Sequence, residues 1–133
     1  MHTKKDQFQQ LLQPLYFFMQ LSNTAYAKYS ANKILLHAEA LRKANRMIYK
    51  LLTDNSGYIP EELQPEIPAL LNHYDTWFIQ FKQHKKDGKP SLGDAFIFYH
   101  LDEQSAFPKA VEEKIFSHYE KMKQELAAEA VPQ

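Results

Sequence analysis

Residues near the segment 95–101 form the densest cluster of titratable groups beside apolar residues in the sequence. The cluster contains Asp94, Tyr99, His100, Asp102 and Glu103. A histidine beside carboxylates titrates near neutral pH and can act as a general base. A simpler interpretation is that Asp94 caps a helix and that residues 102–105 form a polar loop. We favour the simpler one because spacing alone fixes no catalytic geometry, and we predict no catalytic residue.

A ligand pocket is the second chemical possibility for this segment. Trp77, Tyr99 and His100 combine aromatic surface with a titratable ring, as the linings of small-molecule pockets do. These three residues are the candidate ligand-binding residues of an alternative hypothesis, a small-molecule-binding or enzymatic bundle.

The six histidines of the chain do not form a convincing metal-binding pattern. Helical metal sites place ligands three or four residues apart, so that both reach one ion. His100 and Glu103 have such a spacing, but a single pair is half a site. The chain has no cysteine, and neither a Gly-x-Gly-x-x-Gly nor a Gly-x-x-x-x-Gly-Lys motif occurs. We expect no metal site and no cofactor.

A stripe of basic residues follows one predicted helix and consists of Arg42, Lys43, Arg46 and Lys50. Lys and Arg side chains bind the phosphates of nucleic acids. The net charge of the chain is zero, however, and such a stripe is usually a solvated helix face. Nucleic-acid binding is therefore the second alternative, ranked below the others. We attribute a further basic cluster to the end of a helix, where cations are favoured: Lys82, Lys85, Lys86 and Lys89.

The zero net charge hides an asymmetry between the two halves of the chain. Residues 1–60 carry eight Lys/Arg and three Asp/Glu, whereas residues 61–133 carry eight Lys/Arg and thirteen Asp/Glu. We favour the interpretation that the two halves pack together with complementary faces over a head-to-tail contact with a partner. Charge placement alone seldom decides a contact.

Aromatic residues are the most unusual feature of the composition, with nine Phe, eight Tyr and one Trp. A thin helical bundle does not readily bury so many rings, so we expect some at the surface. Protein interfaces are enriched in such residues. The leading hypothesis is therefore a non-enzymatic interaction module that binds a protein partner or forms a homodimer. Its candidate contact residues are Tyr16, Phe17, Tyr26, Tyr29 and Asn45.

Asn45 is included because it interrupts the apolar seam of a predicted helix. A lone polar residue in a seam often sets register or oligomeric state at some cost in stability. The alternative is that the seam tilts and Asn45 lies at its rim.

Helices must position these residues, because apolar residues recur at helical spacing along most of the chain. A long helix is predicted over 25–53, after a break at 22–24 where Ser, Asn and Thr prefer capping positions. A further helix is predicted to end at 87–90, and the last one to open near 105–108. The clearest apolar stripe is that of the helix before 87–90: Ile67, Leu70, Leu71, Tyr74, Phe78 and Phe81. The core face of the last helix is Val111, Ile115, Tyr119, Met122 and Leu126.

Two segments leave alternatives open. Either a helix starts near Pro14, or a helix that begins near Lys5 is kinked at this proline. The run 95–101 is apolar on all sides, as expected of a buried strand or of a short buried helix. We favour a helix that starts at Ser91 and Asp94, because no second strand is available for pairing.

The sequence thus predicts an all-α fold: a helical bundle of four to five helices, mostly antiparallel, in a single domain over 1–133 with a frayed end at 127–133. No run approaches the ~20 apolar residues that a membrane span needs. An apolar stretch at 11–21 is interrupted by Pro14 and by glutamines, which argues against a secretory signal peptide. Together with the absence of cysteine, this favours a soluble, cytoplasmic protein.

Overall fold

The computed structural model describes residues 3–98 and 107–130. Helices account for most of this part, and the predicted all-α helical bundle is confirmed. The elements in chain order are α1 (Lys4–Gln7), a π-helical turn (Phe8–Leu12), α2 (Gln13–Ala31), α3 (Leu35–Asp54), two 3-10 helices (Ser56–Tyr58 and Glu61–Glu66), α4 (Ile67–Gly88) and α5 (Lys109–Ala130). None of the described helices combines the length and the apolar composition needed to cross a membrane.

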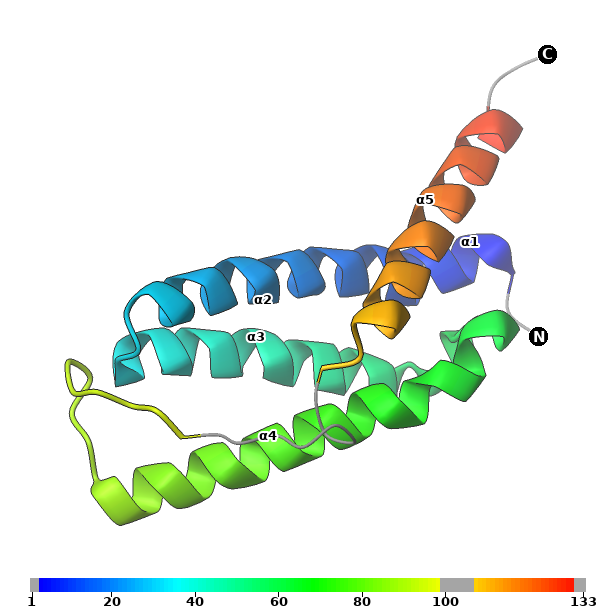
Figure 1. The fold of residues 1–133 in the computed structure, drawn as a ribbon. Helices are drawn as coiled ribbons and strands as arrows, with labels where there is room; N and C mark the ends of the chain where they lie inside the picture. Colours follow the sequence, from blue (N-terminus) through cyan, green and yellow to red (C-terminus); the bar gives the residue numbers. More distant parts are fainter. Residues whose placement is uncertain (1–2, 99–106, 131–133) are drawn as a thin grey trace.

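Helices α2, α3 and α4 lie in a row with α3 in the middle, and consecutive helices run in opposite directions (Figure 1). Helix α5 crosses the row at the end where the chain begins, close to α1 and the π-helical turn. Helices α2 and α3 pack most closely, whereas the backbones of α3 and α4 approach each other at fewer points. The wider spacing between α3 and α4 leaves room for long side chains.

Two hydrophobic clusters fill the interior at opposite ends of the row. The larger cluster lies where α5 and the π-helical turn meet the end of α3 and the start of α4. The smaller cluster is rich in aromatic rings and joins the end of α2, the start of α3 and the second half of α4. Its largest members are Tyr29, Leu35, Leu41, Trp77, Phe81, Phe96 and Phe98.

Pro14 occupies the first turn of α2, directly after the π-helical turn Phe8–Leu12. Helix α1 begins at Lys4, where Thr3 and Asp6 form a capping box. Proline has no N–H to donate to the carbonyl four residues earlier, and its ring crowds that carbonyl, so the wider π-turn accommodates it. The helical chain therefore starts well before Pro14, as one of the two alternatives predicted, and departs from regular geometry just ahead of it.

The predicted break at 22–24 and the predicted continuous helix over 25–53 are both wrong. Helix α2 continues through 22–24, and the Ser22 hydroxyl donates a 2.7 Å hydrogen bond to the side-chain oxygen of Asn45 in α3. Ser and Asn favour caps because their side chains bond to nearby backbone. Here the side chains of Ser22 and Asn45 bond to each other across the two helices instead.

The chain breaks at 32–34, between α2 and α3, because a distant segment supplies the backbone partners there. The Leu35 N–H donates to the carbonyl of Asp94 at 3.0 Å, and the Phe96 N–H donates to the carbonyl of Lys33 at 2.8 Å. These bonds satisfy groups that a continuous helix would have paired internally. Tertiary contacts therefore determine where the chain breaks between α2 and α3.

The predicted short helix at 95–101 is wrong for its described part, residues 95–98, which are extended. A single antiparallel bridge joins Ala95 to Ile34, and the described residues contain no strand. Residues 99–101 lie outside the described part of the chain.

Alternate residues of this extended segment face the core. Phe96 and Phe98 are buried, whereas Ala95 and Ile97 are exposed. The two-residue period is that of an extended chain with one apolar face. The Tyr29 hydroxyl donates to the Phe96 carbonyl at 2.5 Å, which satisfies a backbone group that has no helical partner.

Ser91 and Asp94 form a turn and not the predicted start of a helix. The Ser91 N–H donates to the Asp94 carboxylate at 2.8 Å, and the Asp94 N–H donates to the Ser91 carbonyl at 3.0 Å. This turn directs the chain from the end of α4 back toward α3.

Helices α4 and α5 confirm the predicted apolar stripes. In α4, Leu70, Tyr74 and Phe81 are buried, and the helix ends at Gly88 within the predicted range. In α5, the buried residues include Val111, Ile115, Tyr119 and Met122. Helix α5 continues to Ala130.

Candidate functional site

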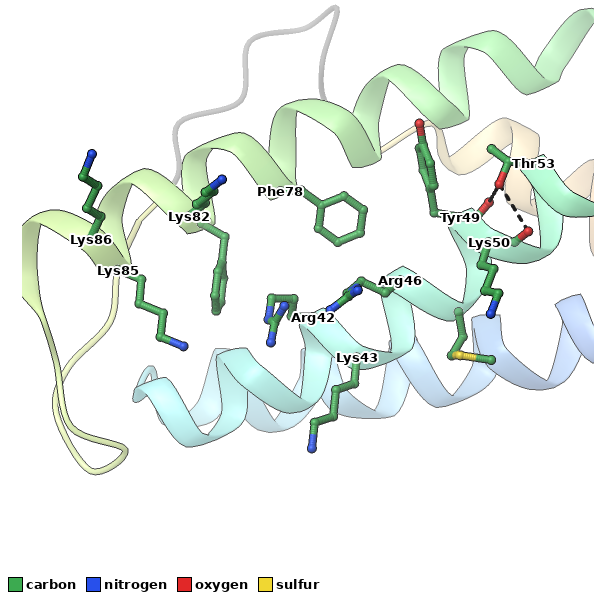
Figure 2. A pocket seen from close by; sticks show the side chains of 12 residues that line it. Arg42, Lys43, Arg46, Tyr49, Lys50, Thr53, Phe78, Lys82, Lys85 and Lys86 are labelled. Atoms are coloured by element: carbon green, nitrogen blue, oxygen red, sulfur yellow. Dashed lines mark hydrogen bonds between the residues drawn. The ribbon is translucent and has the colours of Figure 1, made fainter.

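A groove between α3 and α4, which we call the α3–α4 groove, brings together the two basic clusters of the sequence. Its volume is about 1160 Å³. Among the described residues that line it, seven are Lys or Arg and none is acidic. The basic residues are Arg42, Lys43, Arg46 and Lys50 from α3, and Lys82, Lys85 and Lys86 from α4 (Figure 2).

Helical spacing places the α3 cations on one face. Arg42, Arg46 and Lys50 follow each other at four-residue intervals, so that each lies about 6 Å further along the axis. The neighbouring positions Leu41, Ala44 and Ile48 are buried and hold α3 in the bundle. The basic face is therefore fixed by the packing of the opposite face.

The α4 cations lie in the last turns of that helix. Lys85 and Lys86 occupy its final turn, where a positive charge is favoured by the carbonyl end of the helix dipole. The interpretation that this cluster terminates a helix therefore holds. The same residues also line the α3–α4 groove, because α4 runs antiparallel to α3 and its end lies beside the start of α3.

Glu39 forms ion pairs with two of the seven groove cations and offsets one positive charge. Its carboxylate accepts from the Arg42 guanidinium at 3.0 Å and from the Lys85 ammonium at 2.9 Å. Partial burial raises the pKa of Glu39, but the hydrogen bonds and charges of Lys85 and Arg42 outweigh burial and hold the pKa below its ordinary value of 4.5. The carboxylate thus stays ionised and links α3 to α4.

The other five groove cations have no ion pair within residues 3–98 and 107–130. They are Lys43, Arg46, Lys50, Lys82 and Lys86, and all five are exposed. Like charges gathered at one site favour a negatively charged ligand or a layer of counterions. The groove is therefore a concentrated positive site on a chain of zero net charge.

The charge asymmetry of the two halves is only partly compensated inside the molecule. Among the described residues, ion pairs between residues 1–60 and residues 61–133 involve Lys4 with Glu125 and Glu129, and Glu39 with Lys85. Of the eight Lys/Arg in residues 1–60, the described ion pairs engage only Lys4 and Arg42. Pairing between the halves thus leaves the groove largely uncompensated.

Aromatic side chains form the floor of the α3–α4 groove. Phe81 is buried, and the Arg42 guanidinium lies over its ring, 5.5 Å from the centroid. Phe78 and Tyr49 are half-buried, and their rings meet edge to face with centroids 6.0 Å apart. A hydrogen bond to Asp75, with partial desolvation, raises the pKa of Tyr49, so its hydroxyl stays neutral.

The predicted partner-binding aromatics are divided between surface and interior. Phe17 and Tyr26 are 60% and 50% exposed. Tyr29 is fully buried. Tyr16 is half-buried, and its ring stacks on that of Tyr119 with centroids 4.0 Å apart. Phe17 and Tyr26 on α2 are therefore the predicted contact residues that present surface.

Asn45 lies inside the molecule, with 4% of its surface exposed. Its hydrogen bond with Ser22 joins α3 to α2. The interpretation that Asn45 lies at a rim is wrong, and a role in setting the register of α2 on α3 agrees with the geometry.

Of the three predicted ligand-binding residues, the structure describes Trp77 alone. Trp77 is 4% exposed and packs against Phe78, Phe81 and Phe98, with ring centroids 5.2 to 5.5 Å apart. Tyr99 and His100 lie outside the described residues. No group of three potential metal ligands occurs among the side chains that the structure describes.

The α3–α4 groove was not foreseen because each cluster was interpreted alone. One signal was available: in antiparallel neighbours the last turns of the second helix lie beside the first half of the preceding helix, where Arg42 and Lys43 are found. Comparison with models of known protein families, with curated proteins and with solved structures finds no significant match to this chain.

Proposed function

We propose that the protein binds nucleic acid through the α3–α4 groove. The observation that supports this most strongly is the gathering of five cations without described ion pairs around one groove, contributed by two helices. Phosphates neutralised by Lys and Arg release counterions, and this release drives binding. A cytoplasmic location, where RNA is abundant, is part of the proposal.

The shape of the site favours a strand over a membrane surface. The cations follow the helix axes, so they can contact successive charges of a linear polyanion. They also line a recess whose floor is made of aromatic side chains, and a flat layer of lipid headgroups cannot enter such a recess. An acidic protein segment is linear as well, and the experiment below separates the two.

The test is the affinity for fluorescent single-stranded DNA and RNA of mixed sequence, measured by anisotropy at low salt. The matched variants are Arg46→Glu with Lys82→Glu in the groove, and Lys5→Glu with Lys121→Glu at exposed sites on α1 and α5. Both pairs change the net charge equally. We expect the groove variant to raise Kd at least about tenfold, equivalent to ~1.4 kcal/mol, and the control to change it little.

Three outcomes would overturn the proposal. The first is that no oligonucleotide binds. The second is that both variants weaken binding equally, which would show a diffuse effect of net charge. The third is that polyglutamate competes as well as an oligonucleotide does, which would point to an acidic protein partner.

A second candidate function is association with a protein partner or with a second copy through α2. Phe17 and Leu21, one turn apart, are 60% and 46% exposed. Leu21 also lines a shallow, mostly apolar depression between α2 and α3 of about 320 Å³. Exposed apolar residues next to a depression are typical of interaction sites.

Sedimentation velocity over a range of concentrations tests the homodimer form of this candidate. We expect a species larger than the monomer that Phe17→Ser with Leu21→Ser abolishes. Ile79→Ser is the control, because Ile79 is 69% exposed on α4. A monomer at every concentration would contradict self-association.

A further inference from the structure

We infer that the α3–α4 groove takes single-stranded nucleic acid and that the ring of Phe78 stacks against one of its bases. This inference rests on the proposed nucleic-acid binding and adds the class of strand and a second kind of contact. It depends on the position of Phe78 among the groove cations.

Phe78 lies between cations of both helices. It belongs to α4 and lines the same recess as Arg46 and Lys50 of α3 and Lys82 of α4. Figure 2 shows its ring pointing from α4 into the space between the helices, toward Arg46 and Tyr49. A strand held by these cations would pass the ring.

Neighbouring rings hold Phe78 in place. Tyr49 and Trp77 meet it edge to face, with centroids 6.0 and 5.5 Å away, and the Tyr74 ring lies at 6.4 Å with its plane inclined by 27°. A ring that is already ordered loses little conformational entropy when a ligand stacks on it. Phe78 is also half-buried, so part of its surface faces the groove.

Two of the other large rings of this region, those of Trp77 and Phe81, are not available for stacking. Trp77 and Phe81 are 4% and 3% exposed, and the Arg42 guanidinium lies over the ring of Phe81. Tyr49 is half-buried like Phe78 and lines the same groove, but its hydroxyl is hydrogen-bonded to Asp75 of α4, whereas Phe78 has no polar group and lies directly among the cations of both helices. Phe78 is therefore the aromatic side chain of the groove best placed to receive a base.

A base can stack on an aromatic side chain only if its face is not already covered by a neighbouring base. In a duplex the faces of the bases are covered by stacking, whereas a single strand can present them. A groove that combines cations for the backbone with a ring for a base matches the common design of proteins that bind single strands. We therefore expect the groove to prefer a single strand over a duplex.

The experiment compares three probes of equal length: oligo(dT), a strand of the same backbone with abasic sites, and a duplex. They are titrated against the wild type, Phe78→Leu and Phe78→Tyr. Leucine retains apolar packing without a ring, and tyrosine retains the ring. Thermal unfolding of each variant reports whether the fold is intact.

We expect oligo(dT) to bind the wild type more tightly than the abasic strand and the duplex. Phe78→Leu should raise Kd for oligo(dT) about tenfold and leave Kd for the abasic strand unchanged, whereas Phe78→Tyr should retain affinity. Equal binding of all three probes, or equal losses for oligo(dT) and the abasic strand in Phe78→Leu, would overturn the inference and leave nucleic-acid binding standing. Failure of every probe to bind would instead remove the proposed function.

Discussion

Glu39 is the residue that shapes one end of the α3–α4 groove. It accepts hydrogen bonds from Arg42 on its own helix and from Lys85 on α4, so one carboxylate links the two helices. The Lys85 side chain is 47% exposed, and such a pair contributes little to stability in salt. Its main effect is on position, because it holds two long side chains that would otherwise move freely.

Replacement of Glu39 by glutamine should make the stability of the protein less sensitive to acid. The pKa of Glu39 is lower in the folded protein than its ordinary value of 4.5. Its stabilising contribution is therefore complete above that value and is lost as the pH falls through the folded pKa. Urea unfolding at neutral pH and below pH 4.5 measures this, and an identical loss of stability on acidification in both proteins would contradict it.

The Tyr29 hydroxyl should stabilise the fold through its bond to the Phe96 carbonyl. Tyr29→Phe removes this donor and leaves a buried carbonyl with one partner fewer, at a cost of roughly 1 kcal/mol. Tyr26→Phe is the control because Tyr26 is 50% exposed on the same helix. Thermal or urea unfolding compares the two variants, and equal stabilities would show that the buried bond contributes nothing.

The extended segment 95–98 closes the smaller cluster by inserting alternate side chains. Phe96 is fully buried and contacts Phe81, with ring centroids 4.9 Å apart, whereas Ile97 is 62% exposed. The segment also supplies backbone partners at the break between α2 and α3. It therefore helps to decide where α3 starts and so where the basic face begins.

Alanine substitutions at neighbouring positions test the alternation of buried and exposed side chains in this segment. Phe96→Ala should destabilise the protein by about 3–5 kcal/mol, because it opens a cavity in the core. Ile97→Ala should change stability by less than about 0.5 kcal/mol, because the side chain is exposed. Chemical unfolding measures both, and comparable costs at the two positions would contradict the alternation.

Elements with strong local signals were predictable from the sequence, and elements defined by tertiary contacts were not. Helix α4 has a continuous apolar stripe and ends at Gly88, so its period and its end were both evident. The break at 32–34 has no proline or glycine and depends on bonds to residues 94–96. The apolar run at 95–101 fits two periods equally well, so sequence alone could not show that 95–98 is extended.

At the scale of the whole molecule, the candidate site forms only because α3 and α4 pack side by side. The sequence predicted the stripe from Arg42 to Lys50 and a basic cluster on α4, and only the antiparallel order expected of the bundle indicated that the two could lie side by side. Their meeting depends on the antiparallel packing of α3 and α4 over the smaller cluster. The zero net charge argued against nucleic-acid binding, although charge that is spread unevenly over the surface can still create a strong local field.

The dependence of oligonucleotide affinity on salt tests the central claim most directly, because it counts the phosphates that the protein neutralises. If the five cations without described ion pairs each contact a phosphate, the logarithm of the association constant should fall with the logarithm of salt concentration with a slope of about −3.5 for a single strand. Arg46→Ala with Lys82→Ala should reduce the steepness by about 1.4, since two contacts are lost. A slope near zero, or the same slope in the wild type and the variant, would contradict the assignment of the α3–α4 groove as the binding site.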